Sequence, residues 1–157
     1  MAREAESLKI LKTLLEEKYQ ETLDSVSEPI KNDVTEYLAY ITGDLHEEIE
    51  LNDKLIPVKM GQRGIEELAL EFEDGSSGLK EAVTLCVRLA VAKHLSEQDS
   101  QCLVLDDPFI HMSKNRSKRM IDLFNKLEKE NNLQIIILTH RELEFTGLEG
   151  TMINIQQ

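Results

Sequence analysis

Two polar clusters in this chain directly follow short apolar runs. Asp106-Asp107 comes after the apolar run at 102–105, and Thr139-His140 comes after a second one. Ligands of parallel α/β sheets bind beyond the carboxyl ends of the strands. Adjacent carboxylates at the end of a buried strand are costly unless a cation or hydrogen-bond donors meet them, and Mg²⁺ shared with phosphate oxygens is the commonest solution. One carboxylate would bind the ion, and the other could orient or deprotonate a water that attacks a terminal phosphate.

A third polar cluster, Ser76-Ser77-Gly78, stands at the start of a predicted helix over 79–95. We call it the serine-glycine turn. A hydroxyl and the free backbone N–H groups of a helix N-terminus bind anions readily. Each cluster also has a plain structural interpretation: the serine could cap the helix, the acid pair could turn the chain, and the histidine could be an ordinary core or surface residue. The coincidence of acids and histidine on successive strand ends favours the functional interpretation.

The elements that must position these residues alternate between strands and helices. Strands are predicted at 102–105, 133–138 and 152–155, and helices at 79–95, from Ser113 to Asn131-Asn132, and near 141–145. Strands this apolar are typical of a parallel sheet covered by helices on both faces. We therefore predict an α/β fold with parallel strands flanked by helices.

Two helices are predicted at the N-terminus. Apolar residues at helical spacing predict the first over 4–25, and Ser27-Glu28-Pro29 is typical of a cap and a first-turn proline that start a second, ended by Gly43. The pair could pack on the core, or it could be the stump of a longer coiled coil, because three heptads are too few to decide.

A β-hairpin is predicted next, with strands at 48–51 and 55–58 around an Asn52-Asp53 turn. Pro57 indicates an edge strand. Four of the seven glycines fall between 61 and 78, which predicts loops around a short segment at 65–72.

Composition limits the classes of function. The chain is 41% hydrophobic and 31% charged, as globular proteins are. No apolar run approaches the roughly 20 residues that span a bilayer, and the charged start lacks the apolar middle of a signal peptide, so we expect a cytoplasmic protein with no membrane partner. A net charge of −12 should repel DNA phosphates from this segment. Cys86 and Cys102 lie in apolar stretches and are predicted to be buried free thiols.

Four segments of the chain, in order, resemble the C-terminal lobe of the SMC, SbcC and RecN group of ABC-type ATPases. They are 74–81, similar to the signature motif; 85–90, similar to the helix after it; 103–109, similar to Walker B; and 135–140, similar to the strand that ends in the switch histidine. The likeness covers 65–156 and is nearest to bacterial SbcC-like or YhaN-like coiled-coil ATPases. It implies a partial P-loop NTPase fold, with the end of a coiled coil at 1–45 and the ATPase lobe at 46–157.

The resemblance also implies a mechanism. In this family two heads sandwich two ATP molecules, and each site combines Walker A and B of one head with the signature motif of the other. Asp106 would then hold Mg²⁺, Asp107 would polarise the attacking water, and His140 would sense the γ-phosphate. The serine-glycine turn would touch the ATP of the opposite head.

Three positions depart from the family pattern. Asp107 stands where many members have glutamate, which implies slower hydrolysis. Gly75 replaces the usual leucine before the signature serine, and Ser113 replaces an aspartate of the loop that contacts the second head. The last two changes affect contact between heads and therefore the strength of dimerisation.

No GxxxxGK[ST] pattern is present. We therefore expect the chain to be part of a larger protein whose N-terminal Walker A lobe completes the site. The completed head would bind ATP and Mg²⁺, form a head–head homodimer and act in DNA repair or chromosome maintenance, with DNA contacted through the full-length protein. The chain alone should hydrolyse no ATP. Two alternatives remain: a non-catalytic protein-interaction module with an ATPase-derived fold, and an unrelated metal-dependent phosphotransfer fold, such as a receiver or nuclease, that uses Asp106 and Asp107.

Overall fold

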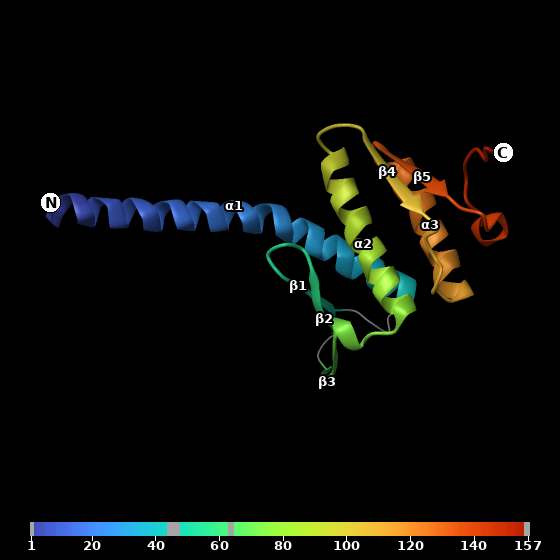
Figure 1. Cartoon of the computed structure of the whole chain (residues 1–157), viewed down its shortest axis with the longest axis horizontal. Helices are drawn as coiled ribbons and strands as arrows, with labels where there is room; N and C mark the ends of the chain where they lie inside the picture. The colour runs from blue at the N-terminus through green and yellow to red at the C-terminus, as the bar shows by residue number, and fades with distance from the viewer. Residues whose placement is uncertain (1, 44–47, 63–64, 156–157) are drawn as a thin grey trace.

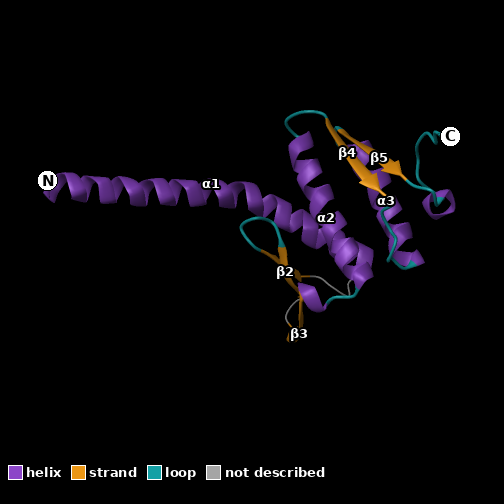
Figure 2. Cartoon of the chain, viewed as in Figure 1, coloured by secondary structure: helices purple, strands orange, loops and turns teal. Residues whose placement is uncertain are grey.

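The computed structural model describes residues 2–43, 48–62 and 65–155. Figure 1 shows a long helix that leads into a body with a small antiparallel sheet on one side and a parallel strand pair beside two helices on the other, and Figure 2 separates helices from strands. The elements are α1 (Ala2–Thr42), β1 (Glu48–Leu51), β2 (Pro57–Gln62), β3 (Ile65–Glu71), η1 (Phe72–Asp74), α2 (Ser77–Ser96), β4 (Gln101–Asp106), α3 (Lys114–Glu130), β5 (Leu133–Leu138) and η2 (Glu142–Phe145). The predicted α/β class is confirmed.

The helix α1 is continuous, so the predicted break at Ser27-Glu28-Pro29 is wrong. Pro29 lies inside the helix, and Ser27 is buried within it instead of capping a new one. Proline removes one helical hydrogen bond and bends a helix. The helix continues nevertheless because the residues after the proline pack against α2 and α3. Figure 1 shows the N-terminal half projecting from the body. Gly43, with a φ of +69°, ends the helix as predicted.

The predicted hairpin is present as β1 and β2, but its second strand covers 57–62 and not 55–58, and its turn covers 52–56 and not only Asn52-Asp53. The strand β3 extends it to an antiparallel sheet of order β1-β2-β3. The short segment predicted at 65–72 is present as β3, whereas the loop predicted before it is wrong at residues 61–62, which belong to β2, and residues 63–64 lie outside the described part of the chain. Gly61 marks a close approach of two strands, since a Cβ there would lie 3.2 Å from the Ala69 Cα. Pro57 lies in the central strand and not at an edge. It is the first residue of β2 and sits opposite Leu51 at a register shift, a position where a proline is tolerated.

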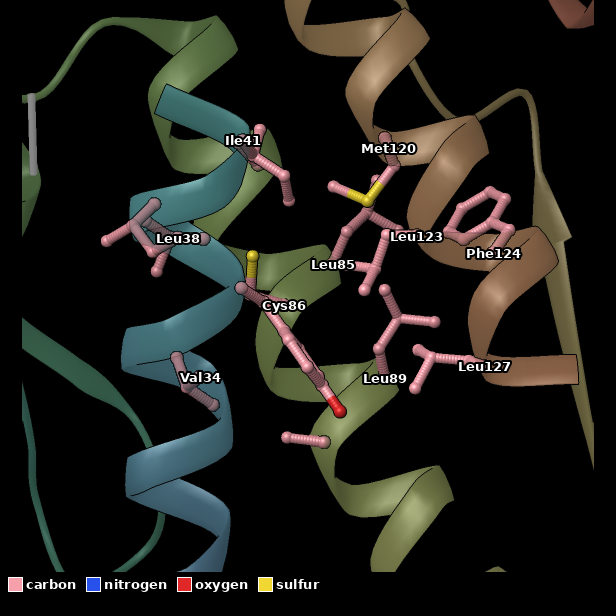
Figure 3. Close-up of a cluster of buried hydrophobic side chains, with 14 of the residues drawn as sticks. Val34, Leu38, Ile41, Leu85, Cys86, Leu89, Met120, Leu123, Phe124 and Leu127 are labelled. Carbon is pink, nitrogen blue, oxygen red and sulfur yellow. The ribbon is translucent and has the colours of Figure 1, made fainter. Parts of the chain in front are cut away.

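The core lies between α1, α2 and α3. Figure 3 shows their side chains meeting from three directions: Val34, Leu38 and Ile41 from α1, Leu85, Cys86 and Leu89 from α2, and Met120, Leu123, Phe124 and Leu127 from α3. Truncating one such leucine to alanine costs about 2–5 kcal/mol. No helix in the described part of the chain has both the length and the apolar character of a membrane span.

The strands β4 and β5 pair in parallel, and their carboxyl ends coincide because Asp106 pairs with Leu138. The helices α2 and α3 pack on this pair. One inward residue of each strand, Leu105 in β4 and Leu133 in β5, belongs to the buried core. This register places the residues that follow both strands at one edge of the sheet.

The opposite side of the parallel sheet is uncovered in the described part of the chain, so the prediction of helices on both faces is wrong. We call this side the outer face and define it as Cys102, Val104, Ile136 and Leu138. All four side chains are exposed. Side chains alternate along a strand, so the helices bury only every second residue. Cys102 is therefore exposed, contrary to the prediction, whereas Cys86 is buried as predicted.

The predicted final strand at 152–155 is also wrong. No strand is formed there, and Met152, Ile153 and Ile155 are 66%, 80% and 86% exposed. A strand needs a neighbour to satisfy its backbone groups. Residues 152–155 thus have the apolar pattern of a strand, but no strand among the described residues pairs with them.

Candidate active site at the ends of the parallel strands

The structure brings Asp107, Thr139 and His140 together at the carboxyl ends of β4 and β5. The backbone N–H of Asp107 donates to the Leu138 carbonyl over 2.8 Å and so extends the strand pairing. Thr139 Oγ1 donates to Asp107 Oδ1 over 2.7 Å, and His140 Nδ1 lies 2.9 Å from Asp107 Oδ2. We call these three residues the strand-end cluster. Its members meet as the strand pattern predicts.

Arg141, which the sequence reasoning missed, adds a positive charge to this cluster. Its backbone N–H donates to Thr139 Oγ1 over 3.0 Å, and its Nε lies 4.0 Å from Asp107 Oδ1. Its Nη1 donates to Glu144 over 3.0 Å. The only sequence signal for this role is its place directly after His140.

These neighbours hold the pKa of Asp107 below its ordinary value. The largest cause is the hydrogen bond from Thr139; desolvation opposes it, and the charges of His140 and Arg141 lower the pKa further. The Asp107 side chain is 24% exposed and that of His140 is 78% exposed, so water reaches both. A carboxylate with a lowered pKa is a weak base, and Asp107 is therefore better suited to orient and polarise a water than to deprotonate it fully.

Asp106 ends β4, and its side chain is exposed on the side of the sheet that carries Val104. No group of three or more candidate metal ligands exists among the described residues. The adjacent carboxylates of Asp106 and Asp107 fit Mg²⁺, which proteins hold through one or two carboxylates together with phosphate oxygens and water.

The serine-glycine turn lies at the start of α2. Ser76 caps the helix, because its Oγ accepts from the Leu79 N–H over 3.3 Å, and both serines are exposed. The structural interpretation of Ser76 is thus correct, and its exposure leaves the predicted contact with a second head open. Gly78 is buried, and a Cβ there would clash with the His111 carbonyl oxygen.

The loop at 108–113, between β4 and α3, was not predicted to hold unusual backbone. Asp107 has a φ of 40° and Phe109 a φ of 90°, conformations that cost about 1–3 kcal/mol each outside glycine. Phe109 is buried, and its ring stacks 5.8 Å from Phe124 and 5.1 Å from Phe145. Packing of these rings holds the turn in its strained form.

Glu81 was also missed. Its Oε1 accepts from the Ile110 N–H over 3.1 Å, and its Oε2 accepts from the His111 N–H over 2.9 Å. No local sequence signal links a glutamate in the second turn of a helix to backbone groups about thirty positions later.

Comparison with known proteins finds similarity to ATPases and ATP-binding proteins. No protein-family model matches the chain. It is 33% identical to the DNA double-strand break repair Rad50 ATPase of Methanocaldococcus jannaschii over 88 residues. These residues make up 56% of this chain and 8% of that protein. The fold agrees with a structure from work on ATP-driven dimerization and DNA stimulated activation of SMC ATPases, with a TM-score of 0.66 and 19% identity over 90% of this chain and 82% of that one.

The chain resembles the C-terminal lobe of an SMC- and Rad50-like ABC ATPase head. A second solved structure supports this: the Smc head domain with an extended coiled coil, bound to the C-terminal domain of ScpA and derived from Pyrococcus furiosus, has a TM-score of 0.64 and 21% identity over 90% of this lobe and 36% of that chain. The predicted resemblance and the P-loop NTPase type of fold are thereby confirmed. The lobe spans less than a tenth of the Rad50 relative.

Proposed function

We propose that the chain is the C-terminal half of the ATP-binding and ATP-hydrolysing head of a coiled-coil SMC-like ATPase. The observation that carries the proposal is the strand-end cluster: Asp107 is held ionised by Thr139 and His140 at the shared end of two parallel strands. Asp106 stands beside it with an exposed carboxylate. This set of groups suits the terminal phosphate of a nucleotide and its attacking water.

Each residue has one task in the proposed reaction. Asp106 would hold Mg²⁺, which neutralises and polarises phosphate oxygens when bound. Asp107 accepts a hydrogen bond from the attacking water and so aims it, because each carboxylate oxygen retains a lone pair beyond those used by Thr139 and His140. His140 Nε2 has no hydrogen-bond partner in the described part of the chain, and it is free to contact the γ-phosphate.

A Walker A lobe must supply the phosphate-binding loop, since this chain has none. We propose that the N-terminal lobe of the same protein packs on the outer face. Val104 and Ile136 are 53% and 39% exposed there, and contiguous exposed apolar side chains mark surfaces that bind a partner. Asp106 lies two residues after Val104 and therefore on the same side of β4. A lobe that packs on this side would bring its nucleotide to the acid pair.

The serine-glycine turn supports a head–head homodimer with ATP between the heads. Ser76 and Ser77 are exposed, and the backbone N–H groups at the start of α2 attract anions. The related SMC structure comes from work on ATP-driven dimerization. In the present protein the turn would contact the γ-phosphate held by the opposite head.

The projecting part of α1 supports a coiled-coil arm, and residues 1–45 would form its end. Leu14 and Leu15 are 53% and 62% exposed, and Figure 1 shows the N-terminal half of α1 leading away from the body. We propose that the full-length protein works in DNA repair or chromosome maintenance in the cytoplasm. DNA would be contacted by other parts of it, because this lobe carries a net charge of −12.

The proposal is tested by mixing this chain with the N-terminal lobe of its own protein and titrating Mg-ATP while the mass of the complex is followed by sedimentation. We expect ATP to convert single heads into pairs, and Ser76→Arg to prevent pairing without weakening ATP binding to one head. Pairing that ignores ATP would instead favour the non-catalytic interaction module, which the departures at Gly75 and Ser113 suggest.

A further inference from the structure

Glu81 ties the second turn of α2 to the loop at 108–113. Its two carboxylate oxygens accept the consecutive N–H groups of Ile110 and His111, over 3.1 and 2.9 Å. Hydrogen bonds to a charged acceptor are roughly twice as strong as neutral ones. Because the contact is bidentate, it fixes the orientation of the loop as well as its distance from the helix.

The same helix touches the loop a second time, through Gly78. A Cβ at this position would clash with the His111 carbonyl oxygen, so the backbone of the serine-glycine turn lies directly against the loop. Glu81 and Gly78 are three residues apart and therefore lie on one face of α2. The turn and the loop thus form one unit held by two adjacent contacts.

Asp107 directly precedes this loop in the chain. Asp107 and Phe109 both have positive φ, at 40° and 90°, and such backbone persists only where its surroundings hold it. Phe109 stacks on Phe145, which follows the strand-end cluster in sequence. The direction of the Asp107 carboxylate therefore depends on what holds the loop, and Glu81 holds it on the side of the serine-glycine turn.

We propose that Glu81 is a positioning residue that couples the serine-glycine turn to Asp107. The inference rests on the proposed function. It links the serine-glycine turn, which would face the nucleotide of the second head, to Asp107, which would aim the water in the first head's own site. A nucleotide that moves the turn would pull Glu81 and, through Ile110 and His111, change the direction of Asp107. Hydrolysis in one site would then depend on occupancy of the other.

The first test uses this chain alone and needs no ATPase activity. Glu81→Gln leaves one carbonyl oxygen for two amides, and Glu81→Ala leaves none. We expect the Ile110 and His111 amides to exchange with solvent about tenfold faster or more in Glu81→Ala, with Glu81→Gln between it and the wild type. The carboxyl ¹³C chemical shift of Asp107 at neutral pH should change in both variants, because the carboxylate changes direction when the loop is released.

Glu128→Gln is the matched control, because Glu128 also accepts a backbone amide, that of Ile135, over 2.6 Å. It should leave the exchange of both loop amides and the Asp107 carboxyl ¹³C shift unchanged. If the folded Glu81 variants, checked by circular dichroism, keep the wild-type exchange rates and the wild-type Asp107 carboxyl ¹³C shift, the inference is wrong whatever the ATPase assay shows.

The second test uses the head completed with its Walker A lobe. We expect Glu81→Gln to lower kcat about 10- to 100-fold, as misplaced catalytic groups do, while ATP binding to the single head stays at the wild-type affinity and Glu128→Gln keeps the wild-type kcat. If the wild-type completed head hydrolyses no ATP, the proposed function is wrong. The role of Glu81 in holding the loop would then be judged from the exchange of the Ile110 and His111 amides alone. An active wild type with an equally active Glu81→Gln would overturn the coupling alone.

Discussion

Removing apolar side chains from the outer face should weaken binding of the Walker A lobe without harming this chain. Val104 and Ile136 are 53% and 39% exposed, so the parts left for a partner to cover amount to about one whole side chain. Full burial of one such side chain contributes about 1.5–3 kcal/mol. The double substitution Val104→Ser and Ile136→Ser should therefore raise the Kd for the lobe about 10- to 100-fold.

Isothermal titration of the N-terminal lobe into wild-type and variant chain measures this change directly. Leu95→Ser is the matched control, because Leu95 is 46% exposed but lies in the last turn of α2, away from the outer face. It should leave the Kd unchanged. An unchanged Kd for the double variant, with both proteins folded, would refute the assignment of this face to the lobe.

Three further outcomes follow from the geometry. Phe109→Ala should lower the free energy of unfolding in urea by about 3–5 kcal/mol, because a buried ring is lost from a stack of three. Thr139→Val should raise the pKa of Asp107, measured by ¹³C NMR, since it removes the main cause of the lowered value. Iodoacetamide should label exposed Cys102 and spare Cys86, whose burial raises its pKa, and the Walker A lobe should protect Cys102.

The pH dependence of stability gives the Thr139 prediction a sign. A carboxylate whose pKa is lowered by folding stabilises the protein above the ordinary aspartate pKa of about 3.9, and this contribution is lost as pH falls through the folded value. In Thr139→Val the pKa of folded Asp107 lies closer to its unfolded value, so this contribution to stability is smaller. The melting temperatures of the two proteins should therefore differ above about pH 3.9 and converge in strong acid. The Thr139 prediction is wrong if Asp107 titrates equally in both proteins. The Phe109 prediction is wrong if Phe109→Ala lowers the free energy of unfolding by less than about 1 kcal/mol. The cysteine prediction is wrong if Cys86 is labelled rapidly in the folded chain.

The strand-end cluster could be predicted from sequence because two short apolar runs imply parallel neighbours, and parallel neighbours end at the same edge. Nothing beyond the order of Asp107 and His140 after their strands was needed. The helix break at Pro29 was mispredicted because local capping signals were outweighed by packing of the residues that follow. Tertiary contacts decide such cases.

Two features depend on surroundings that sequence does not show. The residue types of the outer face are those of a strand buried on both sides, so only the structure reveals that helices cover one side. Glu81 reaches amides 29 and 30 positions away, and no periodicity carries such a contact. Both features depend on which distant segments contact a residue, and local sequence patterns do not show such contacts.

The rate of phosphate release measures the central claim most directly: that this lobe holds half of an ATPase site. We expect release when the chain and the Walker A lobe are combined with Mg-ATP, no release from either alone, and loss of the combined rate in Asp107→Asn. Sustained turnover by this chain alone, or full activity of the combined head with Asp107→Asn, would contradict the account.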